Sequence, residues 1–173
     1  MHNVLVLTGV DGSKDGERLL STLFQEMRAA VKKCEKANEL SPSTWQRKDL
    51  LPTIMVTRNI ALTIARADAI LFLTHTRSPT NLNTFIESVG AYAKKPNRLP
   101  GCMAGFIFIG REDPKDLYYF NELFMRVGRM EMNLSPGMLW MQRLSSRKHE
   151  QYAIDLVLSL MKKERESKML EPS

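Results

Sequence analysis

Short, continuously apolar segments recur along the chain, and each ends in glycine or small polar residues. The three clearest span residues 3–9, 69–73 and 101–110. Their apolar residues do not alternate with polar ones, which is typical of strands buried on both faces of a parallel sheet. The pattern therefore predicts at least three interior strands.

Amphipathic segments alternate with these strands. Between residues 17 and 37, apolar side chains recur every three or four positions, as on one face of a helix. Strands that alternate with helices predict an α/β fold, with a parallel sheet and helices on both faces. The same spacing predicts further helices over residues 59–67, 82–93, 114–128, where Gly128 ends the helix, and 147–166.

Two parts of the chain leave alternatives open. Residues 38–57 contain a polar loop and then either a short second strand at 53–57, or no strand, with one helix over 50–67 and Pro52 in its first turn. The sheet therefore has four or five strands. A last strand is predicted at 130–134, followed by a turn at 135–137 and a short second extended piece.

The composition indicates one domain. The chain has 173 residues, of which 43% are apolar and 25% charged, enough for a single core. We assign residues 1–161 to a single domain and residues 162–173 to a polar C-terminal tail that frays. The formal charge is +6, but acids are interleaved with the bases, which favours a solvated surface over a nucleic-acid interface.

The sequence gives no sign of a membrane or an extracellular setting. No segment reaches the roughly 20 apolar residues of a membrane span, and no signal peptide is recognisable. Cys34 and Cys102 are far apart, with no spacing typical of a metal site or a disulfide framework. We expect a soluble, cytoplasmic protein without a membrane or nucleic-acid partner.

The predicted topology locates a candidate site. Loops at 9–16, 74–81 and 110–114 follow strand ends, so they share one edge of a parallel sheet. Open α/β sheets bind ligands at that edge, near the point where the strand order reverses. The hydroxyls and the amide of loop 74–81 suit the edge of a flat heteroaromatic ring.

The segment "ADAILFLTHTRSPTNLNTFIES" (residues 67–88) resembles the third strand and flavin loop of the NAD(P)H-dependent FMN reductases. Glu87 stands for the acid of that family's pattern, and Asn83 replaces its lysine. Residues 99–110, and the later "LFMRVGRMEM" and "LSPG", resemble the family's fourth strand and the segments after it. The resemblance covers roughly residues 1–140. The matching residues of the flavin loop and its helix are Thr74, Ser78, Phe85 and Ile86.

The resemblance implies a three-layer, flavodoxin-like open parallel sheet that binds FMN. It also implies a nicotinamide dinucleotide as electron donor, an unidentified electron acceptor and a homodimer with the flavin at the subunit interface. The flavin carries the chemistry in that family, so no catalytic side chain and no metal are implied. The cofactor-binding residues that it implies are Ser13, Lys14, Gly16 and Arg18 for the phosphate, Thr74, His75, Thr76, Arg77, Ser78, Pro79, Thr80 and Asn81 for the ring, and Gly110 and Arg111 beside it.

The first loop departs from the family. Glu17 and Arg18 stand where the family has asparagine and threonine, and Asp11 and Asp15 add negative charge. One interpretation is a phosphate cradle at the start of a helix. The other is a plain helix cap, with Asp15 at the N-cap and Glu17 in the first turn. The family residue types that the loop keeps are Gly12, Ser13, Lys14 and Gly16.

Two other functions remain open. A non-catalytic flavodoxin-like interaction or regulatory protein, whose cofactor loop has decayed, would explain the acidic first loop. The segments "ADAILFL" (residues 67–73) and "FIESVGAYAKKP" (residues 85–96) also resemble nucleoside deoxyribosyltransferases, in which a glutamate at the place of Glu87 is the nucleophile. Here Gly90 is displaced by one position, and the aspartate and glycine expected before that helix are missing.

Overall fold

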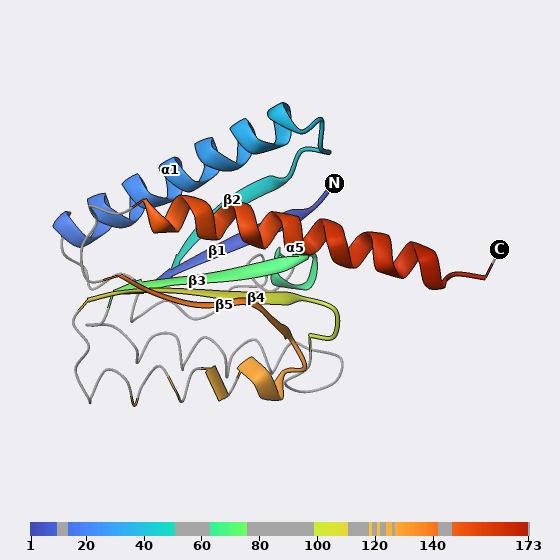
Figure 1. Cartoon of the computed structure of the whole chain (residues 1–173). Helices are drawn as coiled ribbons and strands as arrows, with labels where there is room; N and C mark the ends of the chain where they lie inside the picture. Colours follow the sequence, from blue (N-terminus) through green and yellow to red (C-terminus); the bar gives the residue numbers. More distant parts are fainter. Residues whose placement is uncertain are drawn as a thin grey trace.

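The computed structural model describes residues 1–9, 14–50, 63–75, 99–110, 118, 121, 124–125, 127–141 and 147–172. Short helical segments lie at residues 63–65 and 127–129. The longer elements are β1 (Asn3–Gly9), α1 (Lys14–Ala37), β2 (Thr44–Leu50), β3 (Ala69–His75), β4 (Met103–Ile109), β5 (Asn133–Met141) and α5 (Lys148–Leu170), as Figure 1 shows.

The five strands form one parallel sheet in the order β2-β1-β3-β4-β5. The predicted interior strands are confirmed: β1, β3 and β4 lie in the middle of the sheet, and their side chains are buried on both faces. β2 and β5 form the two edges. The fold is therefore α/β, with the five-stranded alternative correct.

Helices cover both faces of the sheet, as the alternating pattern predicts. Figure 1 shows α1 and α5 side by side over one face, where Val6, Leu71 and Ile107 belong to their shared core. On the other face Phe72 and Phe106 stack with ring centroids 5.3 Å apart, and the segment around Val127 packs there. The result is three layers.

The second strand lies where the sequence analysis predicted a loop. The alternative with one helix over 50–67 is wrong, because β2 spans Thr44–Leu50 and no helix begins at residue 50. The strand predicted at 53–57 lies among residues 51–62, outside the described residues. β2 is an edge strand in which Trp45 is buried against α1 while Gln46 is exposed. On the face toward α1 its side chains are Trp45, Arg47 and Asp49, so β2 lacks the continuous apolar pattern of an interior strand.

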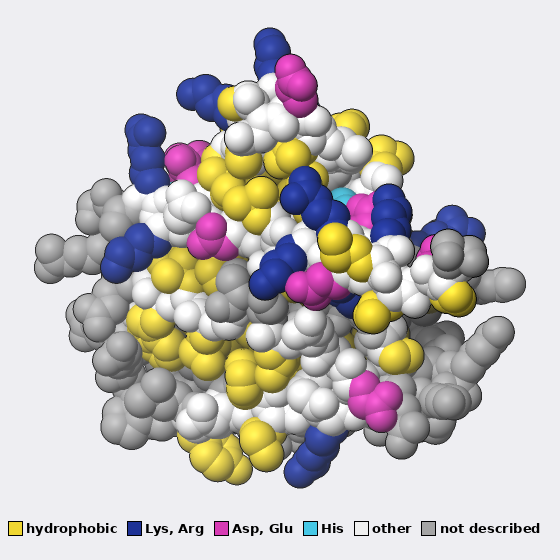
Figure 2. All heavy atoms as spheres, turned by 45° about the vertical axis from the view of Figure 1, so that its right-hand side comes forward, with side chains coloured by type: hydrophobic (Ala, Val, Ile, Leu, Met, Phe, Trp, Pro, Cys, Tyr) yellow, Lys and Arg dark blue, Asp and Glu magenta, His cyan; other side chains and the backbone are white. Residues whose placement is uncertain are grey.

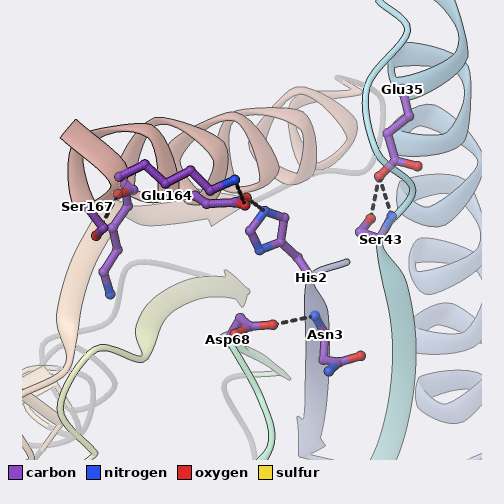
Figure 3. Close-up of polar contacts among 9 residues, drawn as sticks. His2, Asn3, Glu35, Ser43, Asp68, Glu164 and Ser167 are labelled. Carbon is purple, nitrogen blue, oxygen red and sulfur yellow. Dashed lines mark hydrogen bonds and ion pairs between the residues drawn. The ribbon is translucent and has the colours of Figure 1, made fainter. Parts of the chain in front are cut away.

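A buried carboxylate fixes the turn into β2. Glu35, near the end of α1, accepts a hydrogen bond from the backbone N–H of Ser43 at 2.9 Å and another from its hydroxyl (Figure 3). The Ser43 oxygen in turn accepts the indole N–H of Trp45 at 2.9 Å. These bonds hold the chain in the orientation that begins the edge strand.

β5 was predicted as two pieces, a strand at 130–134 and a short extended piece after a turn at 135–137. It does not end in a turn at 135–137 but runs from Asn133 to Met141 with an irregularity. Leu134 pairs with Ala104, and the next pair joins Met138 to Phe106, so the intervening residues leave the ladder. Gly137 has a φ of 109°, which favours glycine. The turn-like residues mark a bulge inside the strand, not its end.

Both remaining helix ends differ from the prediction. Helical residues continue past Gly128 to 129, and the chain reverses at Glu131, whose φ is 60°. α5 does not fray at residue 162: Lys163 donates a hydrogen bond to the carbonyl of Gly101. The division of the chain into a domain and a tail at residue 161 stays a prediction.

The start of the chain lies against α5. His2 Nε2 is 3.1 Å from a Glu164 carboxylate oxygen, as Figure 3 shows.

On the face in Figure 2, lysine and arginine side chains lie among aspartate, glutamate and hydrophobic ones. Among the described helices, none combines the length and hydrophobicity needed to cross a membrane.

Candidate functional site

The strand ends of the parallel sheet define one edge. Gly9 at the end of β1 pairs with Thr74 of β3, which pairs with Phe108 of β4. From β1 the chain goes outward to β2 and returns to the other side of β1 at β3, so the strand order reverses beside β1. Ligands of open α/β sheets bind outside the carboxyl ends at such a reversal. We take this edge as the candidate site.

The start of α1 lies at the same edge. β1 ends at Gly9 and α1 begins at Lys14, so the positive end of the helix dipole adjoins the strand ends. Lys14 and Arg18 are exposed, and Gly16 is also in the first turn. Three of the residues predicted to bind the phosphate are thus close together in the first turns of one helix.

Two acids share this first turn. Asp15 and Glu17 both belong to it. Because α1 begins at Lys14, Asp15 lies inside the helix, and its predicted position at the N-cap is wrong. Both carboxylates still complement the helix dipole. They also lower the positive potential that Lys14 and Arg18 create for an anion.

The end of β3 contributes a buried hydroxyl. Thr74 is fully buried, on the face of the sheet that also holds Ile70 and Phe72. His75 is the last residue of β3 and pairs with Ile109 of β4. These two predicted ring-binding residues therefore lie at the candidate edge, at the strand end that adjoins β1.

Gly110 is held in place by β5. Its N–H donates to the carbonyl of Met141 at 3.0 Å, and its carbonyl accepts the indole N–H of Trp140 at 2.9 Å. Its φ of 145° lies in the region that favours glycine. The backbone beside the predicted ring site is therefore held by β5 as well as by β4, which Gly110 follows.

The other predicted site residues lie outside the described residues: Ser13, Thr76, Arg77, Ser78, Pro79, Thr80, Asn81 and Arg111. The same holds for the helix predicted at 82–93, and with it Glu87, on which the transferase alternative depends. The roles of these residues stay predictions.

The sequence analysis missed a polar cluster at the end of β2. The buried Thr8 hydroxyl donates to an Asp49 carboxylate oxygen, and Arg47 Nε donates to the same oxygen at 2.7 Å. Both side chains of β2 lie on the face that carries α1. Recognising residues 44–50 as an alternating edge strand would have placed Trp45, Arg47 and Asp49 on that face.

This cluster borders an open groove of about 810 Å³ between α1 and β2. Its charges are balanced, because Arg47 is held by Asp49 and the basic residues of α1 stand beside acids. The lining residues are Lys14, Glu17, Arg18, Ser21, Thr22, Gln25, Glu26, Arg47 and Asp49. The groove thus extends from the candidate edge along the side of α1 that faces β2.

A second hollow, of about 450 Å³, lies at the opposite edge of the sheet. Asn3, Thr44 and Arg66 are among its lining residues, all close to the amino ends of β1, β2 and β3. Parallel α/β sheets do not place their ligands at that edge. We therefore keep the carboxyl edge as the candidate site.

Comparisons with known proteins agree with this geometry. No protein-family model and no curated protein sequence matches the chain. An oxidoreductase from Corynebacterium diphtheriae matches with a TM-score of 0.63 at 14% identity, over 94% of this chain and 98% of that one. Oxidised Flavodoxin 1 from Bacillus cereus matches with a TM-score of 0.62 at 9% identity, over 92% and 97%.

A flavodoxin, WrbA-like protein from Agrobacterium tumefaciens also matches, with a TM-score of 0.58 at 13% identity, over 94% of this chain and 99% of that one. At these identities the similarity establishes the fold. The fold of this protein is flavodoxin-like, as the resemblance of residues 67–88 implied.

Proposed function

We propose that the protein is a flavodoxin-like oxidoreductase that binds FMN, takes electrons from a nicotinamide dinucleotide and passes them to an acceptor. The observation that carries the proposal is the position of α1. Its first turn follows β1 directly and adjoins the point where the strand order reverses. A helix N-terminus at such a point is suited to a phosphate group.

The donor set at this edge fits an FMN phosphate. Lys14 and Arg18 are cations beside the positive end of α1. Asp15 and Glu17 oppose them: at an effective dielectric of about 20, a carboxylate roughly 6 Å from a phosphate charge costs about 3 kcal/mol before salt screening. Solvent screens the exposed acids and cations alike, so their effects largely cancel and the positive end of the helix leaves a net attraction for the phosphate.

A bound FMN would supply the redox chemistry, by taking electrons from a nicotinamide and giving them to an acceptor. The chain supplies binding and orientation. Lys14 and Arg18 would neutralise the phosphate, while the paired ends of β1, β3 and β4 form a rigid frame for the ring. Gly110, fixed by Met141 and Trp140, would border the ring on the β5 side.

The nicotinamide donor and the homodimer are parts of the same proposal. Both are supported by the resemblance of residues 67–88 to the FMN reductases. The redox class is further supported by the structural neighbours, which include flavodoxins and a protein described as an oxidoreductase.

Titration with FMN, followed by flavin fluorescence, tests the proposal. We expect one FMN per chain, and faster oxidation of NADH or NADPH by the loaded protein than by free FMN at the same concentration. A folded protein that leaves the fluorescence of FMN unchanged would remove the proposal. Gel filtration of the loaded protein tests the dimer separately.

A second candidate is a non-catalytic flavodoxin-like interaction or regulatory protein. The observation that favours it is the pair of acids in the first turn of α1, which stabilise the helix without any ligand. This candidate predicts a stable fold, no FMN binding and no oxidation of either nicotinamide. The same titration therefore separates the two candidates.

A further inference from the structure

Three potential metal ligands meet where α1 packs against the start of α5. Glu26 comes from α1, and His149 and Glu150 come from the first turn of α5. One ligand atom from each residue lies within 4.8 Å of the others. Around a tetrahedral ion with ligands at about 2.0–2.2 Å, ligand atoms lie roughly 3.3–3.6 Å apart, so side-chain shifts of about 1 Å would bring these three residues into range.

His149 distinguishes this cluster from an ordinary group of surface acids. Its side chain is only 2% exposed, and its Nε2 lies 2.6 Å from a Glu26 carboxylate oxygen. Its Nδ1 is buried and has no hydrogen-bond partner among the described residues. Buried polar atoms are normally paired. The imidazole therefore sits among two carboxylates with one nitrogen unused.

We propose that Glu26, His149 and Glu150 bind a divalent cation of the zinc class. One imidazole nitrogen with two carboxylates suits Zn²⁺ better than Mg²⁺ or Ca²⁺, which take oxygen ligands. Glu26 is exposed and lines the groove between α1 and β2, so the site opens to solvent on that side. Water completes the coordination there.

A bound ion would join the middle of α1 to the beginning of α5. These two helices form one layer of the fold, although their contacting residues are far apart in the sequence. The site lies on the face of the sheet that α1 and α5 cover. Its ligands include none of the residues proposed to hold FMN. Its test needs no flavin, so its failure would leave the proposed function untouched.

The experiment is a calorimetric titration of the flavin-free, tag-free full chain with zinc chloride. We expect one ion per chain and a melting temperature that rises with the zinc concentration, because the ion binds only the folded state. Glu26→Gln and Glu150→Gln should each weaken binding by at least about tenfold, since even residues that only support a metal ligand contribute that much. Circular dichroism checks that both variants fold.

Two control variants test the location. His2→Gln removes another histidine–glutamate pair, the one with Glu164, and Glu17→Gln removes a carboxylate of the same groove outside the cluster. Both should bind zinc as the unmodified protein does. If the unmodified chain takes up no zinc, or if the Glu26 and Glu150 variants bind it equally well, the proposal is wrong.

Discussion

The hydroxyl of Tyr152, on α5, accepts a hydrogen bond from the backbone N–H of Phe106, on β4, at 2.8 Å. The same hydroxyl donates to the carbonyl of Gly137 in β5. Phe106 and Gly137 lie where the pairing of β4 with β5 shifts register. One side chain from α5 therefore completes the hydrogen bonding of the sheet at its irregularity.

Replacing Tyr152 with phenylalanine should lower the free energy of unfolding by about 1–3 kcal/mol. The ring keeps its size, but the variant leaves a buried N–H and a carbonyl without their partner. Urea unfolding measures the loss. A Tyr152→Phe protein as stable as the unmodified chain would show that water replaces the hydroxyl at no cost.

Gly105 tests the same packing from the other side. A Cβ at Gly105 would lie 2.9 Å from the Tyr152 hydroxyl, whereas a Cβ at Gly128 would meet nothing within 4 Å. Gly105→Ala should cost about 1–3 kcal/mol, and Gly128→Ala should be neutral or slightly stabilising. Combined with Tyr152→Phe, the Gly105 variant should cost less than the sum of the two, because its closest contact, with the Tyr152 hydroxyl, is removed.

Stability should fall in alkali because of Cys102. Burial raises the pKa of this thiol from 9.0 to about 12, so the unfolded chain loses its proton at a lower pH than the folded one. The contribution of the buried, protonated thiol to the free energy of unfolding is complete below pH 9 and is lost as the pH rises towards 12. In urea unfolding, the stability difference between the unmodified chain and Cys102→Ala should shrink over that window. A constant difference would contradict the raised pKa.

Glu35 should be essential for the turn into β2. Glu35→Ala removes the acceptor of the Ser43 N–H and hydroxyl and should cost about 1–3 kcal/mol in urea unfolding. Glu35→Gln is the matched control, because its amide oxygen can still accept both bonds. It should retain most of the stability, and equal losses in the two variants would contradict this role of the acceptor oxygen.

The sequence predicted the interior of the fold better than its edges. β1, β3 and β4 are buried on both faces, so their continuous apolar pattern identifies them without ambiguity. β2 was missed because an edge strand needs few apolar residues. The start of β2 also depends on the hydrogen bond between Glu35 and Ser43, which are too far apart in the sequence for a local pattern to show it. β5 was divided into two pieces because the bulge at Gly137 has the composition of a turn.

The edge of the sheet that holds the candidate site was predicted, but the side-chain contacts around it were not. Strand alternation was enough to locate the edge at Gly9, Thr74 and Gly110, because parallel strands end together. The contact of Thr8 with Asp49 could not be predicted, nor could the pairing of His149 with Glu26. Each contact joins two elements that come together only in the tertiary structure, β1 with β2 and α1 with α5.

Charge at the start of α1 should tune FMN binding. Asp15→Asn removes a carboxylate from the first turn, so FMN should bind more tightly, and more so at low salt where screening is weak. The helix should lose about 0.3–1 kcal/mol of stability at the same time. A salt series of FMN titrations measures the effect, with Glu39→Gln, an exposed acid beyond the other end of α1, as control. Equal affinity of the Asp15 variant and the unmodified chain at low salt would place the phosphate elsewhere.

FMN binding at the edge formed by β1 and the start of α1 is the basis of the proposed function. It can be decided by fluorescence titration of three proteins with FMN: the unmodified chain, a Lys14→Ala, Arg18→Ala double variant, and Arg66→Ala at the opposite edge of the sheet. We predict one FMN per chain for the unmodified protein and for Arg66→Ala. The double variant should bind at least about tenfold more weakly, as expected for two charge-assisted phosphate contacts of about 1 kcal/mol or more each. Equal FMN affinity in all three proteins, or none in the unmodified chain, would contradict binding at this edge.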